Sequence, residues 1–253
     1  MKGLLTFKWI LTTILVLIGV GVMVRLGIWQ LDRLKWRQSF NEHYLAQINA
    51  PAVDLNIDVQ DSNLVDMEYR EILVNGVYDF KNEVYLQNQV YDGLPGYHVL
   101  TPLIINNGES AVIVNRGWIP LDFSESEIKE FQPQGNVSIS GVIRLGLVDT
   151  TFKNGLGTLE DDGTIRYWKY INLEKLSEQI PYKIESIYIE KTANENERYP
   201  VPAFKEIEIT QGPHLGYAIQ WFFFAALLGG GYPAFIRKTL GEKKQNQQEN
   251  KGE

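Results

Sequence analysis

Two long apolar runs stand near the ends of the chain, and the residues between them follow a different pattern. The first run covers residues 9–29 and contains one charged residue, Arg25. The second covers residues 216–236 and has Gln220 as its one strongly polar residue. A helix of about 20 apolar residues spans the hydrocarbon core of a bilayer. The pattern therefore predicts two transmembrane helices, over residues 9–29 and 214–236.

The first run also has features of a signal peptide, because Lys2 and Lys8 resemble the basic region that opens such a leader. The run is longer than the usual apolar region of about 7–15 residues, and no small-residue cleavage site follows it. We therefore expect an uncleaved anchor. No arginine-rich, acid-poor leader precedes the run, which disfavours a mitochondrial transit peptide and favours the plasma membrane of a bacterium.

Charged residues beside the two runs predict the orientation in the membrane. The tail, residues 237–253, opens with basic residues, and positive charge is typical of cytoplasmic segments. Two spans then place both termini in the cytoplasm and residues 30–212 outside it. The basic residues after the first run, Arg33 and Lys35 among them, favour the opposite orientation when taken alone. We give the second run more weight and expect residues 237–253 to form a cytoplasmic polar tail.

The middle of the chain is rich in β-branched and aromatic residues. The first helix is expected to continue to about Ala46 and to end by Pro51, because the residue before a proline is pushed out of the helical region. A short helix is predicted from Asn172, as its N-cap, to Gln179. Six strands are predicted, over residues 70–78, 83–90, 97–105, 111–115, 137–145 and 184–190.

Strands at this spacing, with turn signals at residues 92–96 and 106–108, are typical of an antiparallel barrel or sandwich. The predicted fold is therefore a membrane protein of the α+β class. Two transmembrane helices flank an extracytoplasmic, mainly antiparallel β domain, barrel- or sandwich-like, with a short helix and a juxtamembrane helix. The polar residues 194–199 and 242–253 are expected to be mobile.

The composition excludes several kinds of covalent link, metal site and catalytic motif. The chain has no cysteine, so it forms no disulfide, c-type haem attachment site or cysteine-ligated zinc site. It has no G-x-S-x-G, phosphate-loop or H-E-x-x-H motif. The acidic residues 160–162 precede a glycine and are interpreted as a solvated turn. We therefore expect neither an enzyme nor a nucleic-acid-binding protein.

An antiparallel pair of transmembrane helices would bring the outer end of the first run close to the start of the second. Glycine and alanine residues on both runs permit close approach; they are Gly19, Gly21, Gly27, Gly216 and Ala218. Two sets of residues then fall at helical spacing. They are Arg25, Trp29 and Arg33 on the first helix, and His214, Tyr217, Ala218 and Trp221 on the second. A site between these sets would combine two guanidinium groups, three aromatic rings and an imidazole.

That combination fits a haem. Arginines bind propionate carboxylates in bidentate fashion, aromatic rings stack on the macrocycle, and a neutral imidazole is an axial ligand of iron. His214 is the candidate iron ligand. The same residues also fit an anchored domain without a cofactor, because tryptophan, tyrosine and arginine are ordinary anchors at a membrane boundary. Residue types alone favour this simpler interpretation.

Other polar residues have simpler interpretations. His43 and His98 are taken as ordinary helix and strand residues, because the three histidines show no metal-ligand spacing. Gln220 is interpreted as an interhelical hydrogen-bonding residue. Residues 115–120, in which a strand ends in Arg116 and a glycine turn, are interpreted as a packed corner with a cation–π pair, and the alternative is part of a surface that binds a partner.

Ordered motifs over nearly the whole chain resemble the Surfeit locus protein 1 family. The motifs are GIWQLDRLKW at 27–36, YR at 69–70, GVYD at 76–79, GLPGYHVLTPL at 93–103, VNRGWIP at 114–120 and HLGYAIQWF at 214–222. Residues 149–166 and 192–198 carry no family pattern. The chain departs from the family at Gln89, where arginine is common.

The resemblance implies a two-span assembly factor of haem–copper cytochrome c oxidase. Such a protein helps to insert haem a into the catalytic subunit, and His214 is the histidine carried over by motif. On this interpretation Arg25, Trp29, Arg33, Tyr217 and Trp221 surround the haem. The alternative is a membrane-anchored scaffold that steadies the oxidase subunit or the haem-a synthase without holding haem.

Overall fold

The computed structural model describes residues 7–57, 63–105, 108–147, 156–193, 198–204 and 207–249. The chain divides into two compact units. One is helical and consists of residues 1–42 and 208–253, and the other is β-rich and consists of residues 43–207. Residues 106–107 of a predicted turn, 194–197 of a predicted mobile segment and the last four residues of the tail lie outside the described ranges.

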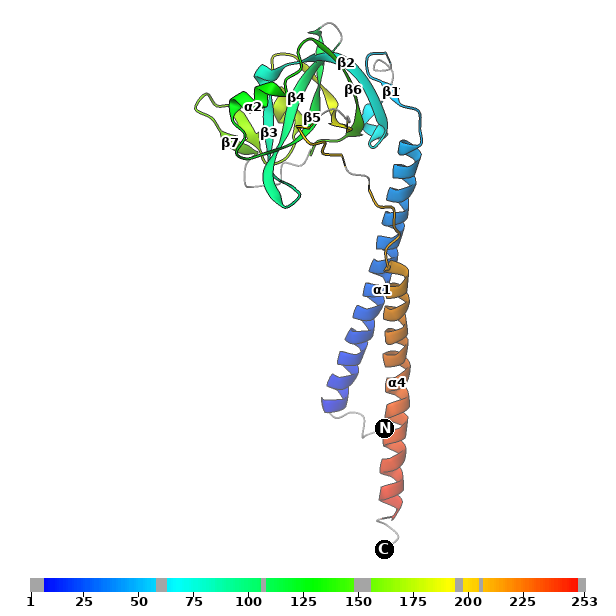
Figure 1. Cartoon of the computed structure of the whole chain (residues 1–253). Coiled ribbons are helices and arrows are strands. Elements are labelled where there is room, and N and C mark those ends of the chain that lie inside the picture. Colours follow the sequence, from blue (N-terminus) through cyan, green and yellow to red (C-terminus); the bar gives the residue numbers. More distant parts are fainter. Residues whose placement is uncertain are drawn as a thin grey trace. The chain divides into compact units, whose positions relative to one another are not determined.

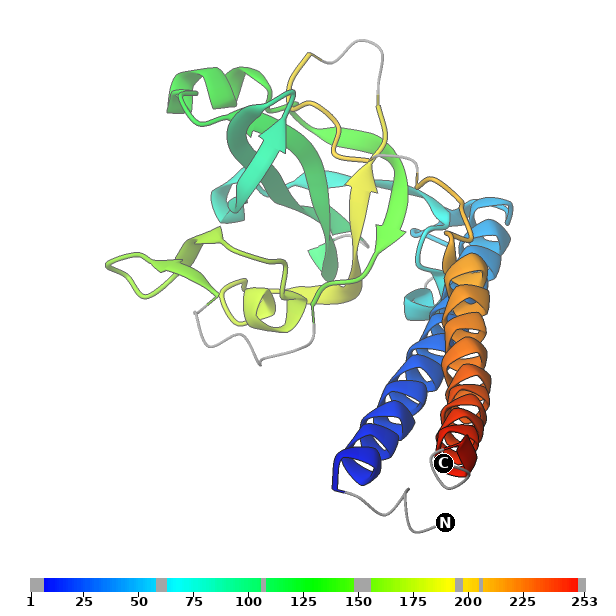
Figure 2. The ribbon, with the colours of Figure 1, turned by 90° about the horizontal axis from the view of Figure 1, so that it is seen from below.

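The helical unit contains most of α1 (Phe7–Ile48) and all of α4 (His214–Glu249), which lie side by side in Figures 1 and 2. Both are long and apolar enough to cross a membrane. Only 6 % of each apolar stretch is buried within the protein, unlike the core helix of a globular fold. The prediction that the first helix continues past Trp29 is confirmed. The polar residues after 236 extend α4 instead of forming a separate tail, because lysine, glutamate and glutamine favour helix.

The β-rich unit is built on a closed five-stranded barrel. Its described strands are β1 (Val53–Asp54), β2 (Glu71–Tyr78), β3 (Val84–Tyr91), β4 (Leu94–Ile105), β5 (Ser110–Pro120), β6 (Asn136–Arg144), β7 (Gly157–Leu159), β8 (Ile165–Trp168) and β9 (Lys183–Lys191). The ring runs β2-β6-β9-β5-β4 and closes through a short β2–β4 pairing, Val77 with Ile104 and Tyr78 with Leu103. Strands β3, β8 and β7 extend the sheet beyond β4.

The prediction of a barrel-like, mainly antiparallel sheet is confirmed, because six of the nine pairings between the described strands are antiparallel. Parallel pairs join β1 to β2, β3 to β8 and β5 to β9. Parallel neighbours need a long crossover connection. The β5–β9 pair has one, because β6, β7, β8 and α3 (Leu173–Ser177) lie between these strands in sequence.

Alternating burial explains why these sequences form barrel strands. In β2 every second residue is buried, beginning with Ile72 and ending with Tyr78. These residues share a core with β4, β5, β6 and β9, where Leu103, Val112 and Ile187 are fully buried. A second core covers another face of the sheet, where α3 packs around Trp168 of β8.

The remaining elements divide into predicted and unpredicted ones. All six predicted strands are present, and Asn172 is the N-cap of α3, because its Oδ1 accepts a hydrogen bond from the Lys175 amide at 2.9 Å. The predicted solvated turn at residues 160–163 joins β7 to β8 and is exposed. Strands β1, β7 and β8, helix α2 (Glu125–Glu130), and the short 3-10 helices η3 (Leu64–Met67) and η4 (Phe80–Asn82) were not predicted.

The predicted corner at residues 115–120 is wrong. Strand β5 continues to Pro120, and the register of its pairing with β4 shifts beside Gly117. The shift is a bulge within the strand, so the glycine does not form a turn. The Arg116 guanidinium lies 5.2 Å from the Tyr78 ring centre and 5.3 Å from that of Phe80, so the cation–π partners come from β2 and η4.

Candidate functional site

Helices α1 and α4 pack antiparallel through small residues. A Cβ at Gly27 would lie 2.7 Å from the Phe222 ring, and a Cβ at Gly19 would lie 3.3 Å from Leu228. Ala218 is 1 % exposed. Further along, Thr13 Oγ1 is 2.6 Å from the Tyr232 hydroxyl. The predicted close approach is thus confirmed at Gly19, Gly27 and Ala218, whereas a Cβ at Gly21 or Gly216 would meet nothing within 4 Å.

His214 is the first residue of α4 and is half-buried against α1. Its Nδ1 is 2.9 Å from Oε1 of Gln30. Gly212, two residues earlier, has φ of +68°, a conformation that favours glycine. A Cβ at this position would lie 3.2 Å from both Nε2 and Cδ2 of His214. The ring is thus held at one nitrogen, and Gly212, which has no side chain, lies beside the other.

The segment before His214 is fixed to α1 at one carbonyl. Thr210 O accepts hydrogen bonds from Arg37 Nε at 2.9 Å and from Asn41 Nδ2 at 3.2 Å. Thr210 Oγ1 in turn accepts from the Gly212 amide at 3.1 Å. These contacts hold residues 210–212 in place and so determine where α4 begins.

The structure does not bring the Arg25–Trp29–Arg33 stripe against His214. All three side chains are exposed, and the Arg33 guanidinium lies 4.0 Å from the ring centre of Trp36 on its own helix. The buried face of α1 instead passes through Gly27, Gln30 and further residues toward Asn41. Each helical residue turns by about 100°, so a stripe that begins two residues before Gly27 faces away from α4.

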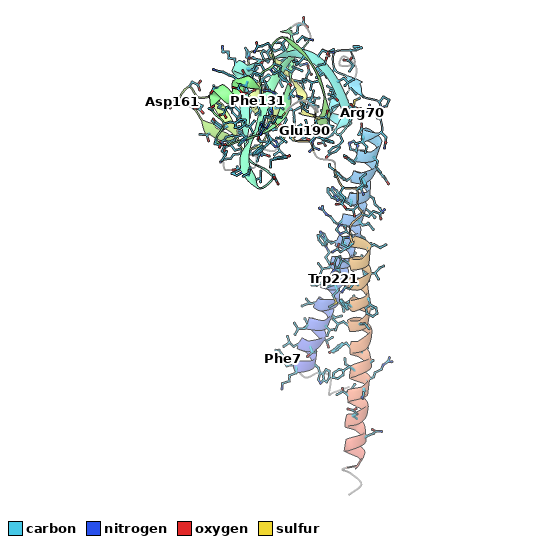
Figure 3. The ribbon with its side chains drawn as sticks, in the orientation of Figure 1. Phe7, Arg70, Phe131, Asp161, Glu190 and Trp221 are labelled. Carbon is cyan, nitrogen blue, oxygen red and sulfur yellow. The ribbon has the colours of Figure 1, made fainter. Side chains whose placement is uncertain are left out.

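The predicted residues of α4 also separate. Ala218 faces α1, and Trp221 is half-buried, with its ring 6.4 Å from that of Phe224 (Figure 3). Tyr217 is 49 % exposed and lies off the buried face. Gln220 is exposed, and among the described residues no hydrogen bond from it to α1 is found, so the interhelical role expected for it is wrong.

Sequence reasoning missed the polar residues on the buried face of α1, which are Gln30, Arg37 and Asn41. Gly27 offered the necessary signal, because it was already expected to permit close approach. Counting three, seven, ten and fourteen residues on from it gives Gln30, Leu34, Arg37 and Asn41, which are all buried or half-buried.

The chemistry available beside His214 is that of a single imidazole. Within the described residues, no group of three or more histidine, cysteine, aspartate or glutamate side chains gathers to hold a metal ion. A metal at His214 would therefore need most of its ligands from elsewhere.

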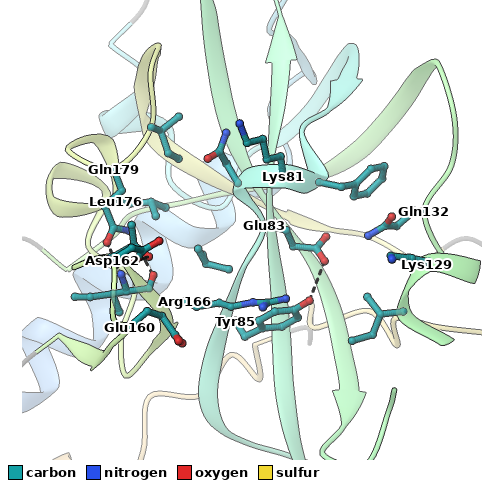
Figure 4. Close-up of a pocket in the computed structure, with 17 residues that line it drawn as sticks. Lys81, Glu83, Tyr85, Lys129, Gln132, Glu160, Asp162, Arg166, Leu176 and Gln179 are labelled. Carbon is teal, nitrogen blue, oxygen red and sulfur yellow. Dashed lines mark hydrogen bonds between the residues drawn. The ribbon is translucent and has the colours of Figure 1, made fainter. Parts of the chain in front are cut away.

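A separate polar cavity of about 720 Å³ opens beside β3 in the β-rich unit (Figure 4). Its charged rim residues are Lys81, Lys129, Arg166, Glu160 and Asp162. Basic and acidic groups thus share the rim, and the cavity indicates no single class of ligand.

Glu83 lines this cavity, and its side chain is 4 % exposed. Its carboxylate accepts hydrogen bonds from the Tyr85 hydroxyl at 3.1 Å and the Thr101 hydroxyl at 2.6 Å, and it pairs with Arg116 at 3.2 Å. Burial and the Glu83 charge raise the pKa of Tyr85 well above its ordinary value, so Tyr85 remains a donor. The Glu83 carboxylate thus binds three side chains of the same fold, which indicates a structural role.

Comparison with known proteins decides the family. The model of the SURF1 family matches residues 17–226. The chain belongs to the SURF1 family. The match includes α1 from residue 17 onward, the whole β-rich unit and the first part of α4, so Gln30 and His214 both lie within it.

Relatives of this SURF1 family member occur in eukaryotes and bacteria. Surfeit locus protein 1 of Arabidopsis thaliana is 25 % identical over 275 residues, which cover 87 % of this chain and 75 % of the relative. Surfeit locus protein 1 of Homo sapiens is 26 % identical over 235 residues, covering 85 % and 75 %. The SURF1-like protein of Rickettsia felis is 24 % identical over 235 residues, covering 90 % and 98 %. The similarity extends over most of each chain.

Proposed function

We propose that this SURF1 family member is an assembly factor for a haem–copper cytochrome c oxidase, and that it binds haem a or hands it to the catalytic subunit. The observation that carries the proposal is the position of His214, at the start of a membrane-length helix, with its Nδ1 held by Gln30. Family membership supports the assembly role. No enzymatic step is part of the proposal.

His214 would hold the iron of a bound haem. A neutral imidazole is a good iron ligand, and the hydrogen bond to Gln30 involves Nδ1 and leaves Nε2 as the other ring nitrogen. A bound haem would supply the redox-active iron that the oxidase needs, while the protein supplies the imidazole and the apolar helix surface around it. We assign no haem contact to Arg25, Trp29 or Arg33, because they lie on the exposed face of α1.

In this proposal α1 and α4 cross the plasma membrane of a bacterium, both termini are cytoplasmic and the β-rich unit is extracytoplasmic. The apolar length of both helices and the bacterial relatives support this placement. His214 then stands at the outer end of its span, on the same side as the β-rich unit. Haem would therefore be received and released near the outer membrane face.

The test is the haem content of the protein after coexpression with haem-a synthase. We expect near-stoichiometric haem in the purified wild type and loss of haem in His214→Ala. His43→Ala is the matched control, because His43 is exposed on α1 and makes only an edge contact with the Tyr69 ring. An unchanged visible spectrum in His214→Ala would show that His214 is not the ligand.

The second candidate is a scaffold for the oxidase subunit or for haem-a synthase. The exposed face of α1 favours it, because Trp29 and Trp36 are 50 % and 49 % exposed and Arg33 stacks on Trp36. Tryptophan and arginine are enriched where proteins bind each other. A wild type that carries no haem yet copurifies with the catalytic subunit would favour the scaffold.

A further inference from the structure

We infer that Gln30 positions His214 by fixing its tautomer, so that Nε2 is the ring nitrogen presented to a metal. The inference rests on the proposed function for the identity of the metal, since His214 is there the haem ligand. It goes further by naming the coordinating atom and the residue that selects it. It also predicts a property of the cofactor-free protein, which can be measured without haem.

The hydrogen bond between the two side chains determines where the ring proton lies. Nδ1 of His214 is 2.9 Å from Oε1 of Gln30. An amide oxygen only accepts hydrogen bonds, so in this orientation of the Gln30 amide Nδ1 is the donor and carries the proton. A neutral imidazole has a single N–H, and its other nitrogen therefore has a free electron pair. In this arrangement that nitrogen is Nε2.

Metal-binding histidines are commonly arranged in this way. The second ring nitrogen donates to a carboxylate, a carbonyl or water, which fixes both the tautomer and the orientation of the ring. Gln30 supplies the amide carbonyl. Loss of such a partner typically lowers metal affinity about 10–100-fold.

Helix packing holds Gln30 within reach of the histidine. Gly27 lies three residues earlier on the same face and contacts the Phe222 ring so closely that a Cβ would lie 2.7 Å away. On the other side, Arg37 and Asn41 fix Thr210. Contacts before and after Gln30 along α1 thus set the spacing between the two side chains.

The surroundings of Nε2 agree with this assignment. A Cβ at Gly212 would lie 3.2 Å from Nε2, and φ of +68° at this residue opposes any other side chain. The backbone conformation therefore disfavours a side chain beside Nε2. Gln30 places a hydrogen-bond acceptor beside Nδ1, and Gly212, which has no side chain, lies beside Nε2.

The direct test is the ¹⁵N NMR spectrum of histidine-labelled, cofactor-free full-length protein in detergent micelles, with His214→Ala used to assign the resonances. We expect His214 to carry its proton on Nδ1 in the wild type. Gln30→Leu should shift the population toward protonation on Nε2, because the acceptor is lost. Gln30→Glu should retain the Nδ1 proton, because a carboxylate accepts the same hydrogen bond.

Gln220→Leu is the matched control, because it makes the same change at an exposed position of the same helix pair and should leave the spectrum unchanged. A wild type with its proton on Nε2, or a Gln30→Leu variant with the wild-type tautomer, overturns the inference.

The haem-loaded protein gives the second readout. After coexpression with haem-a synthase, Gln30→Leu should bind haem about 10–100-fold more weakly, and Gln30→Glu and Gln220→Leu should retain it. Unchanged haem affinity and an unchanged visible spectrum in Gln30→Leu overturn the inference. A wild type with the Nδ1 tautomer but no haem under any condition overturns the proposed function instead, so the two failures are distinguishable.

Discussion

At the scale of single residues, Glu83 and Arg116 form a buried ion pair in the β-rich unit. Both side chains are 4 % exposed, and the Arg116 guanidinium also donates to the Phe131 carbonyl. Removing one partner of such a pair leaves a buried charge without compensation. The pair joins the start of β3 to the middle of β5, so its loss affects the barrel and the cavity together.

We expect Arg116→Met to lower the free energy of unfolding by about 3–5 kcal/mol, because Glu83 would keep a buried charge with only two hydroxyl donors. Urea unfolding of the full chain in detergent, followed by near-ultraviolet circular dichroism, measures the change. Lys175→Met removes a lysine from the exposed pair with Glu178 and should leave the midpoint unchanged. Equal midpoints for the two variants would contradict the structural role of the buried pair.

Asp79 makes stability depend on pH. Burial by itself would raise its pKa, but hydrogen bonds from Asn82, Tyr182 and the Lys81 amide outweigh burial and hold the pKa below its usual value. A carboxylate with a lowered folded-state pKa stabilises the fold above its unfolded pKa, about 3.9. That contribution is lost as the pH falls through the folded-state value.

We therefore expect Asp79→Asn to be less stable than the wild type at about pH 7, and the difference to shrink as the pH falls below about 4. Urea midpoints over this range provide the measurement. Tyr182→Phe removes one donor but keeps the carboxylate, so its acid-side loss should be smaller than in the wild type and should be complete at a higher pH. A difference between Asp79→Asn and the wild type that stays constant with pH would contradict this role.

At the scale of elements, local pattern predicts those strands whose two faces differ. Strand β2 alternates buried and exposed residues along its whole length and was predicted with nearly correct bounds. Strands β7 and β8 were missed because they are three and four residues long and flank a polar turn. Helix α2 has only six residues, although its capping box of Ser124 and Glu127 was visible in the sequence.

Helical spacing groups residues onto one face but does not say which face meets a neighbour. Arg25, Trp29 and Arg33 do share a face of α1, yet that face is exposed. Gly27 identifies the packed face, because the absence of a side chain there admits the Phe222 ring. The motif resemblance led to His214, but its partner Gln30 became evident only from the packing.

We expect Gly27→Leu to separate α1 from α4, because its Cβ would overlap the Phe222 ring. Gly21→Leu is the matched control, since it brings the same gain in helix propensity at a position with nothing within 4 Å. Because the chain has no native cysteine, Thr13→Cys and Tyr232→Cys can report the packing through a short bismaleimide crosslinker. Gly27→Leu should lower the crosslinking yield, and an equal yield in both variants would place the contact elsewhere.

At the scale of the whole molecule, the features that local pattern could not predict are long-range ones. The barrel closes through only two residue pairs between β2 and β4, which lie about 26 residues apart in sequence. The parallel pairing of β5 with β9 likewise depends on the intervening chain. Such contacts leave no periodic signal in either strand. The sequence therefore predicted a barrel or a sandwich and did not decide between them.

Basic residues leave two orientations of the helix pair open. Arg237, Lys238, Lys243 and Lys244 follow the second apolar run, and Arg33, Lys35 and Arg37 follow the first. In the structure Arg37 donates to Thr210 O, and Arg33 stacks on Trp36. Arg33 and Arg37 thus have local roles that do not depend on the orientation in the membrane. The charges after the second run therefore carry more weight.

We expect the β-rich unit to lie outside the cytoplasm and both termini to lie inside. Single cysteines can test this in the cysteine-free chain, at Asp161 in the exposed β7–β8 turn (Figure 3) and at the exposed Gln245 near the end of α4. In intact bacterial spheroplasts, a membrane-impermeant maleimide should label Asp161→Cys and should label Gln245→Cys only after lysis, because a helix pair returns the chain to its starting side. Labelling of Gln245→Cys but not of Asp161→Cys from outside would show that the charges after the first run set the orientation. Labelling of both residues from outside would show that α4 does not cross the membrane.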